Sequence, residues 1–265
     1  MNAKELKRAL TAATTAAQAA GQLLRQNLRE TKKINASFRH DLKLELDVRC
    51  QELIERQLRA AFPDAGFLGE EDLARNIENE HRWVVDPIDG TVNFAYGIPH
   101  SCVSIALQQR LPAPVAPVLQ HKHDEVSPAF ETIVGVVYDP FCDELWTAIQ
   151  GQPARLNNRV IHVSNRAKLG EAIIAMGFSK SESILREMLP SFTRLARRVR
   201  KVRMMGAAAL DMVYVATGRM DAYFEVGVRL WDIAAGGLIL ECAGGEFWRQ
   251  PIKGDHRFQV IATNG

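Results

Sequence analysis

The chain has 265 residues, of which 47% are hydrophobic and 24% are charged, and this composition excludes a disordered or low-complexity protein. Lys and Arg total 33 against 31 Asp and Glu, which gives a net charge of +2. So small an imbalance predicts neither nucleic acid nor a membrane surface as the main partner. The 4 cysteines are far apart and form no CxxC pair, which favours free thiols in a reducing compartment.

The N-terminal segment predicts a helix. Its apolar residues recur at steps of three and four from Leu6 to Leu28, which places them on one helical face. Charges come early and no long leucine-rich core follows, so the segment is not typical of a signal peptide. No later run reaches the roughly 18 apolar residues of a transmembrane helix. We therefore expect a cytoplasmic protein.

The rest of the chain predicts further helices and strands. A second helix is expected to start after Asp47, whose carboxylate would cap it, and to end before Pro63. The run 83–85 is β-prone and predicts a buried strand that ends at Asp86. The other predicted strands are 103–107, 133–138, 144–149, 173–176, 222–225 and 258–262, and the other predicted helices are 183–199, 207–217 and 232–242.

These elements predict a mixed α/β (α+β) fold of layered helices and sheets. Residues 1–170 are expected to form an α+β half, in which two helices precede hairpin-linked strands. Residues 171–265 alternate strand and helix and are expected to form an α/β half. Because a chain of 265 residues can bury one full core, we predict a single domain over 1–265.

Two segments stand apart from these elements. Residues 108–132 carry 4 prolines between two predicted strands, which predicts a long loop. His121 and His123 within it are interpreted as loop residues, because two histidines at this spacing rarely form a metal site. The basic run at 194–203 is typical of a solvated helix end, and a phosphate-facing or partner-facing role for part of it stays open.

Three acidic motifs carry the candidate chemistry. They are GEED at 69–72, DPIDGT at 86–91 and WD at 231–232. Taken singly, they could be a solvated turn, a strand end and a helix N-cap. DPIDGT is harder to explain in this way, because two carboxylates at the end of an apolar strand repel each other unless a cation lies between them.

The oxygen-only character of these motifs indicates the metal and the reaction. A ligand set without His or Cys favours Mg²⁺, with Mn²⁺ as a substitute. Gly90 lets the backbone come close to a ligand, and Thr91 lies at an expected helix start, where N–H groups suit a phosphate. Several carboxylates that share metal ions would support hydrolysis of a phosphate ester.

The longer motifs are GEE at 69–71, WVVDPIDGTVNF at 83–94 and WDIAAGGLILECAGG at 231–245. In these, the chain resembles the inositol monophosphatase family of Mg²⁺-dependent, lithium-sensitive phosphatases. The resemblance extends from about residue 10 to the end, in the family's order. It implies a layered α-β-α-β-α sandwich of the inositol monophosphatase and fructose-1,6-bisphosphatase type.

The resemblance also implies roles for particular residues. The metal ligands, for two or three Mg²⁺ ions, would be Glu70, Asp86, the Ile88 carbonyl, Asp89 and Asp232. Glu70 and Thr91 would act in catalysis by orienting the attacking water, and Asp47 would lie near the third ion. The substrate-binding positions would be Asp89, Gly90, Thr91, Ala207, Ala208, Glu225 and Asp232.

The function implied is that of a phosphoric monoester hydrolase, most simply one that converts inositol 1-phosphate to myo-inositol and phosphate by metal-activated water. Glu225 favours this substrate, because an acid suits a ring of hydroxyls. Fructose 1,6-bisphosphate, histidinol phosphate and 3′-phosphoadenosine 5′-phosphate stay open as substrates, as does a non-catalytic regulatory binding protein on the same fold. Departures from the family pattern at Leu46, Ala207 and Pro153 bear on the substrate more than on the reaction. A homodimer is also implied.

Overall fold

The structure, a computed structural model, describes residues 1–32, 34–38, 41–71, 74–112, 130–178 and 182–265. Its helices are α1 (Ala3–Asn27), α2 (Glu45–Ala61), α3 (Thr91–Ala95), α4 (Glu182–Ala196), α5 (Ala208–Ala216) and α6 (Leu230–Cys242), with a 3₁₀ turn at Leu169–Glu171. The strands before residue 161 are β1 (Ile34–Phe38), β2 (Asp41–Leu44), β3 (Gly66–Gly69), β4 (Ala74–Arg75), β5 (His81–Asp89), β6 (Cys102–Arg110), β7 (Phe130–Asp139), β8 (Glu144–Ile149), β9 (Arg155–Leu156) and β10 (Arg159–Val160). The later strands are β11 (Ile173–Phe178), β12 (Lys201–Arg203), β13 (Ala222–Arg229), β14 (Glu246–Pro251) and β15 (Arg257–Thr263).

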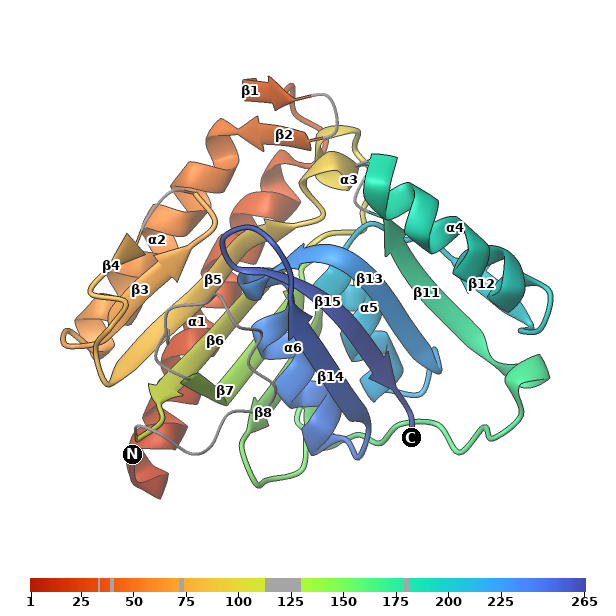
Figure 1. The fold of residues 1–265 in the computed structure, drawn as a ribbon. Helices are drawn as coiled ribbons and strands as arrows, with labels where there is room; N and C mark the ends of the chain where they lie inside the picture. Colours follow the sequence, from red (N-terminus) through yellow and green to blue (C-terminus); the bar gives the residue numbers. More distant parts are fainter. Residues whose placement is uncertain (33, 39–40, 72–73, 113–129, 179–181) are drawn as a thin grey trace.

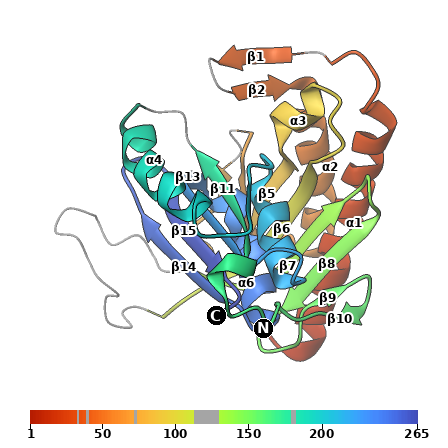
Figure 2. The same ribbon diagram turned by 90° about the vertical axis from the view of Figure 1, so that its right-hand side faces the viewer.

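The helices and the two large sheets form layers (Figure 1). An eight-stranded sheet has the order β10-β9-β8-β7-β6-β5-β3-β4, and a five-stranded sheet has the order β12-β11-β13-β15-β14. Helices α1 and α2 cover the outer face of the first sheet, α5 and α6 lie between the sheets, and α4 covers the outer face of the second (Figure 2). This confirms the predicted α-β-α-β-α sandwich.

The first helix is capped and packed as its sequence requires. The Asn2 side chain accepts hydrogen bonds from the backbone N–H groups of Lys4 and Glu5, both at 3.0 Å, and the Glu5 carboxylate accepts one from Asn2 N at 2.8 Å. The buried face of α1 consists of small residues and Leu24. Gly21 lies so close to the first sheet that a Cβ there would be 2.5 Å from the Tyr138 ring.

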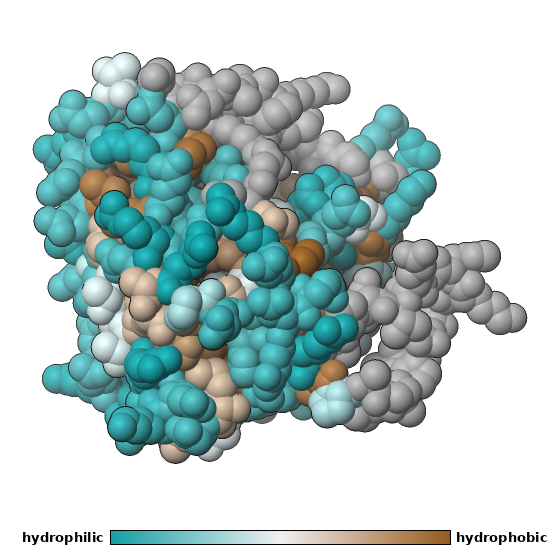
Figure 3. All heavy atoms as spheres, turned by 90° about the vertical axis from the view of Figure 1, so that its left-hand side faces the viewer, coloured by the Kyte–Doolittle hydropathy of each residue, from teal (hydrophilic) through white to brown (hydrophobic). Residues whose placement is uncertain are grey.

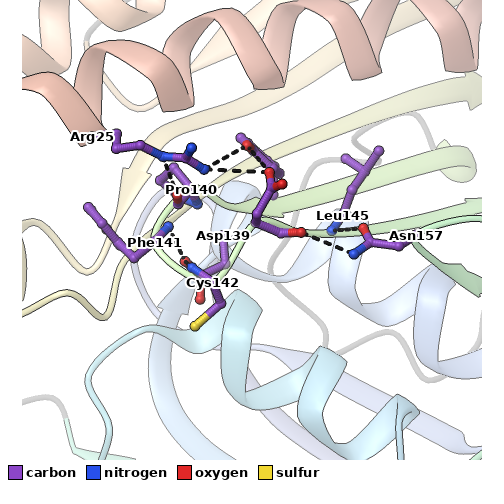
Figure 4. Close-up of polar contacts among 9 residues, drawn as sticks. Arg25, Asp139, Pro140, Phe141, Cys142, Leu145 and Asn157 are labelled. Atoms are coloured by element: carbon purple, nitrogen blue, oxygen red, sulfur yellow. Dashed lines mark hydrogen bonds and ion pairs between the residues drawn. The ribbon is translucent and has the colours of Figure 1, made fainter.

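The end of α1 is also joined to the turn between β7 and β8 (Figure 4). Arg25 Nε donates a hydrogen bond to the Pro140 carbonyl at 2.7 Å. Within the turn, Asp139 Oδ1 accepts hydrogen bonds from Phe141 N at 2.8 Å and from Cys142 N at 3.1 Å. The helix layer is therefore fastened to the first sheet by directed polar contacts as well as by apolar packing.

The structure corrects several predicted boundaries. The prediction that the second helix starts after Asp47 is wrong, because α2 begins at Glu45 and Asp47 is its third residue. The strand predicted to end at Asp86 continues to Asp89 through a bulge that places one extra residue on β5. The sequence did not predict β1 to β4, β9, β10 and β12, because a strand of two to five residues gives too little pattern. It did not predict β14, because this strand lacks a simple apolar alternation.

The proline-rich segment 108–132 is partly strand. Strand β6 extends to Arg110 and β7 begins at Phe130, so the prediction of a loop over the whole segment is wrong at both ends. His121 and His123 lie outside the described residues. Among the helices that the structure does describe, none is long and apolar enough to cross a membrane. The face that Figure 3 shows is mostly hydrophilic, with hydrophobic residues in small groups.

Candidate active site

Sheet pairing brings Glu70 next to Asp86. Strand β3 pairs in parallel with β5, with Gly69 opposite Val85, and Glu70 N donates a hydrogen bond to the Val85 carbonyl at 3.2 Å. The two motifs are separate in the sequence, and the parallel register makes the next residues, Glu70 and Asp86, neighbours. The Glu70 carboxylate is close enough to Asp86 to raise the pKa of that carboxyl.

A buried glutamine on α2 fixes the backbone that carries Glu70. Gln51 Nε2 donates to the Glu71 carbonyl at 3.2 Å, and Glu71 N donates to Gln51 Oε1 at 3.0 Å. Gly69 makes this approach possible, since a Cβ there would be 2.2 Å from Gln51 Oε1. Gln51 was not predicted, because nothing in the local sequence indicates a contact with a loop 20 residues away.

The bulge in β5 turns Asp89 toward the second half of the chain. Asp89 Oδ1 accepts a hydrogen bond from Ala208 N at 3.1 Å, and Oδ2 accepts one from Ala209 N at 2.7 Å. Asp89 is buried, with 7% of its surface exposed. Its carboxylate therefore satisfies N–H groups at the start of α5, where a helix leaves donors without internal partners.

Asp232 lies in the first turn of α6, beside the same strands. It is the third residue of that helix, and its Oδ2 accepts a hydrogen bond from Arg229 N at 2.7 Å. The preceding Trp231 carbonyl accepts a hydrogen bond from Ser104 Oγ at 2.9 Å, and Ser104 is paired with Asp86 across β5 and β6. These contacts bring the third acidic motif to the other two.

Burial raises the pKa of all three aspartates, and neighbouring carboxylates raise it further at Asp86 and Asp232. Burial raises the pKa of Asp86 well above its usual value, and the negative charges of Glu70, Asp89 and Asp232 raise it further. Burial also raises the pKa of Asp89 to about 6, against the opposing effect of the α5 N–H groups. The pKa of Asp232 is well above its usual value because of burial and then of Asp89 and Glu70.

These residues fit a hard divalent cation. In the part of the chain that the structure describes, Asp86, Asp89 and Asp232 form no ion pair with a basic side chain. No three His, Cys, Asp or Glu side chains among the described residues are already arranged to hold one ion, and Asp86 Oδ1 instead accepts a hydrogen bond from Ile88 N at 2.9 Å. Buried oxygen ligands of like charge would be stabilised by Mg²⁺ or a similar ion.

Gly90 and Thr91 follow directly at the start of α3. Gly90 has φ of +90°, and a Cβ there would lie 3.0 Å from the His100 carbonyl oxygen, so both conformation and space require glycine. Thr91 Oγ1 donates a hydrogen bond to the Ile88 carbonyl at 2.9 Å. The carbonyl predicted as a metal ligand and the hydroxyl predicted to orient water are therefore in contact.

Glu225 lies on β13 in a second group of buried acids. Tyr223 donates its hydroxyl to Glu225 Oε2 at 2.6 Å, and Gly177 leaves room for this carboxylate, since a Cβ there would be 1.6 Å from Oε2. Burial raises the pKa of Glu225 to about 7, with a contribution from Asp89. Burial, Asp89 and Glu225 raise the pKa of Asp211 on α5 well above its usual value.

Tyr223 and Asp211 were not predicted as site residues. The alternation of a strand places Tyr223 and Glu225 on one face, so the signal for Tyr223 was present. Asp211 is a charged residue in an otherwise apolar helix, 2% exposed, and its Oδ1 has no hydrogen-bond partner among the described residues. Of the other predicted positions, Ala207 is buried just before α5, and Asp47 Oδ2 accepts a hydrogen bond from Leu44 N at 2.6 Å.

The model of the inositol monophosphatase family matches residues 5–120 and 129–257. The chain belongs to this family. It is 37% identical over 246 residues to "Nus factor SuhB" of Xylella fastidiosa, covering 89% of this chain and 82% of the relative. It is 37% identical over 207 residues to an inositol-1-monophosphatase of Mesorhizobium japonicum, covering 77% of this chain and 71% of the relative.

Solved structures of a suhB protein and of an inositol monophosphatase have the same fold. The extragenic suppressor protein suhB of Bartonella henselae matches with a TM-score of 0.82 at 32% identity, over 96% of this chain and 93% of that one. The inositol monophosphatase of Anabaena matches with a TM-score of 0.76 at 34% identity, over 97% of this chain and 90% of that one. The family supports a phosphatase that acts on a small phosphorylated substrate and is generally metal-dependent.

Replacing Glu225 with glutamine should remove part of the pH dependence of stability. The folded protein keeps a proton on Glu225 up to about pH 7, whereas an ordinary glutamate releases it near 4.5. The free energy of unfolding of the metal-free protein should therefore fall as the pH rises through this window. At about 1.4 kcal/mol per pKa unit, the loss is on the order of 3 kcal/mol.

Urea unfolding in EDTA at about pH 4.5 and about pH 7.5 measures this loss. Glu225→Gln should show a smaller difference between the two pH values than the wild type. Glu182→Gln, at an exposed position on α4, is the matched control and should behave as the wild type. An identical pH dependence in wild type and Glu225→Gln would contradict the assignment.

Proposed function

We propose that this member of the inositol monophosphatase family is a Mg²⁺-dependent phosphatase that hydrolyses inositol 1-phosphate by direct attack of water. The observation that supports it most is the grouping of four acids, in which Asp86 and Asp89 are buried and Glu70 and Asp232 are half-buried. Burial and the neighbouring carboxylates raise the pKa of Asp86 and of Asp232 well above the usual value. Such an arrangement is costly unless a cation binds there. It adjoins Thr91, at the start of α3, on the side where a phosphate would bind.

Each residue would have a separate part in the reaction. Glu70, Asp86, the Ile88 carbonyl, Asp89 and Asp232 would hold two or three ions. When bound, the ions would neutralise the phosphate dianion and lower the pKa of a water. Thr91 Oγ1, which now donates to the Ile88 carbonyl, would orient the attacking water with Glu70. The proton of that water would pass to the Glu70 carboxylate.

The remaining residues would bind the substrate. Backbone N–H groups of Gly90 and Thr91 would donate to the phosphate. Ala207, Ala208 and Glu225 would face the alcohol part, where the Glu225 carboxylate suits a ring of hydroxyls. Asp47 would lie near the third ion. Ala207 offers no hydroxyl to the substrate, which leaves the alcohol part less defined. Fructose 1,6-bisphosphate, histidinol phosphate and 3′-phosphoadenosine 5′-phosphate are the alternative substrates.

A second candidate is a regulatory binding protein, because several similar relatives carry the name "Nus factor SuhB". The surface that favours it is the basic run at 194–203, which passes from the end of α4 to the edge strand β12. Its cations are exposed and pair with no acid among the described residues. A surface of this kind suits an acidic partner.

Phosphate release with Mg²⁺ from a panel of esters tests the two candidates. The panel is both enantiomers of inositol 1-phosphate, fructose 1,6-bisphosphate, histidinol phosphate, 3′-phosphoadenosine 5′-phosphate and glycerol 2-phosphate. We expect the highest kcat/KM for one inositol 1-phosphate, and a loss of about 100-fold or more in Asp86→Asn. Asp143→Asn, in an exposed turn, is the control and should match the wild type.

The other outcomes are equally informative. A preference for a different ester would replace the substrate and keep the reaction. Wild-type rates in Asp86→Asn would contradict the metal assignment. No release from any ester would contradict the phosphatase proposal and favour the regulatory one.

We further infer a homodimer, a cytoplasmic location and lithium sensitivity from the family. Exposed apolar side chains near α3 would suit the dimer: Val92 (42% exposed), Tyr96 (77%), Ile98 (49%) and Met204 (60%). Sedimentation velocity should give a dimer for the wild type and a smaller species for Tyr96→Glu. A wild-type monomer at micromolar concentration would contradict the dimer.

A further inference from the structure

The side-chain amide of Asn93 joins the two halves of the chain beside the candidate site. Asn93 lies in α3, two residues after the end of the DPIDGT motif. Its Nδ2 donates hydrogen bonds to the His100 carbonyl at 2.9 Å and to the Met205 carbonyl at 2.8 Å, and the Gly206 carbonyl is 3.4 Å away. His100 follows α3, whereas Met205 is 112 residues away from Asn93, between β12 and α5.

The contact holds 205–206 tightly against α3. Gly206 has φ of +79°, and a Cβ at this position would lie 3.3 Å from Asn93 Nδ2. A Cβ at Gly90 would lie 3.0 Å from the His100 carbonyl oxygen and 3.2 Å from both the Gly206 carbonyl oxygen and Ala207 Cβ. Two of the carbonyls that Asn93 contacts, those of His100 and Gly206, thus also lie against Gly90.

A second contact fixes the next two residues. The Asp89 carboxylate accepts the N–H groups of Ala208 and Ala209. Asn93 and Asp89 therefore hold the segment 205–209 from its two ends, one as a donor to carbonyls and the other as an acceptor from N–H groups. An amide is needed at position 93, because a carboxylate cannot donate to carbonyl oxygens.

We propose that Asn93 is a positioning residue that sets the width of the substrate site between Gly90–Thr91 and Ala207–Ala208. On the proposed function, on which this inference rests, the first pair would bind the phosphate and the second would face the alcohol part. Asn93 then selects polyol phosphates, whose alcohol part would lie against 207–208 with its hydroxyls toward Glu225, over esters whose alcohol part has no hydroxyls. It acts through the backbone at 205–206 and does not touch the substrate.

Hydrogen–deuterium exchange tests the position of this segment without any turnover. Asn93→Leu has nearly the same shape as asparagine and removes the donor, and Asn93→Asp keeps the size and places a charge against two carbonyls. Both variants should exchange the amides of 204–211 on the order of tenfold faster than the wild type, with the core of β5 to β8 unchanged. Unchanged exchange at 204–211 in either folded variant would overturn the proposal.

Asn264→Leu is the matched control. Asn264 Nδ2 also donates to several acceptors, the carbonyls of Ser164 and Arg166 and the Ser164 hydroxyl, at 3.0 to 3.2 Å. These contacts join the end of β15 to the segment before β11. The control should leave the exchange of 204–211 as in the wild type. Faster exchange there in Asn264→Leu would overturn a specific role for Asn93.

Kinetics with two esters test the selection. Inositol 1-phosphate presents ring hydroxyls, whereas p-nitrophenyl phosphate presents none. Asn93→Leu should lower kcat/KM for inositol 1-phosphate on the order of ten- to a hundredfold, mainly through KM, and should lower that for p-nitrophenyl phosphate much less. Equal losses for the two esters would overturn the selective role.

The two tests separate this inference from the proposed function. If the wild type hydrolyses p-nitrophenyl phosphate but no polyol phosphate, the substrate assignment and the selective role both fail. If the wild type hydrolyses neither ester, the proposed function fails, and the exchange at 204–211 still supports or overturns the positioning role. Circular dichroism of each variant shows that it is folded before either comparison is made.

Discussion

The burial of like charges between the two sheets is the constraint on which the site depends. A carboxylate removed from water is costly, and Asp86, Asp89 and Asp232 raise the cost further because each lies in the field of the others. Backbone N–H groups offset part of this cost. Asp89 accepts a hydrogen bond from Ala209 N in the first turn of α5, and Asp232 accepts one from Arg229 N just before α6. A divalent cation would offset the rest.

The contacts that form the site also hold the halves of the chain together. Asp89 accepts hydrogen bonds from the start of α5, Ser104 donates to the start of α6, and Asn93 donates to the segment before α5. Helices α5 and α6 thus begin at the acidic residues, where the positive ends of their dipoles favour negative charge. A change in the charge of the site would consequently alter the packing between the two sheets as well as the binding of a ligand.

The sequence identified the acids that the fold brings together, but not the residues that support them. DPIDGT and WD identify their acids through local pattern, and the apolar runs predict β5 to β8 and the central helices. The partners of these acids depend on register and on contacts across the fold: Asp89 meets α5 residues 119 and 120 positions away. Gln51 and Asn93 are ordinary polar residues in the sequence, and only the packing of α2 and α3 gives them acceptors. Which alcohol part the proposed site accepts depends on its shape at Ala207 and Ala208, and no motif specifies that shape.

Calorimetric titration of the metal-free protein with Mg²⁺ tests the central claim most directly. Run at a series of pH values in buffers of different ionisation enthalpy, it measures both the binding and the protons released. Since burial and mutual repulsion raise the pKa of Asp86 and Asp232 well above usual values, Mg²⁺ should bind and displace protons from these carboxyls. Saturable binding with proton release is the predicted result. No binding, or binding without proton release, would contradict the claim that these buried acids form the metal site.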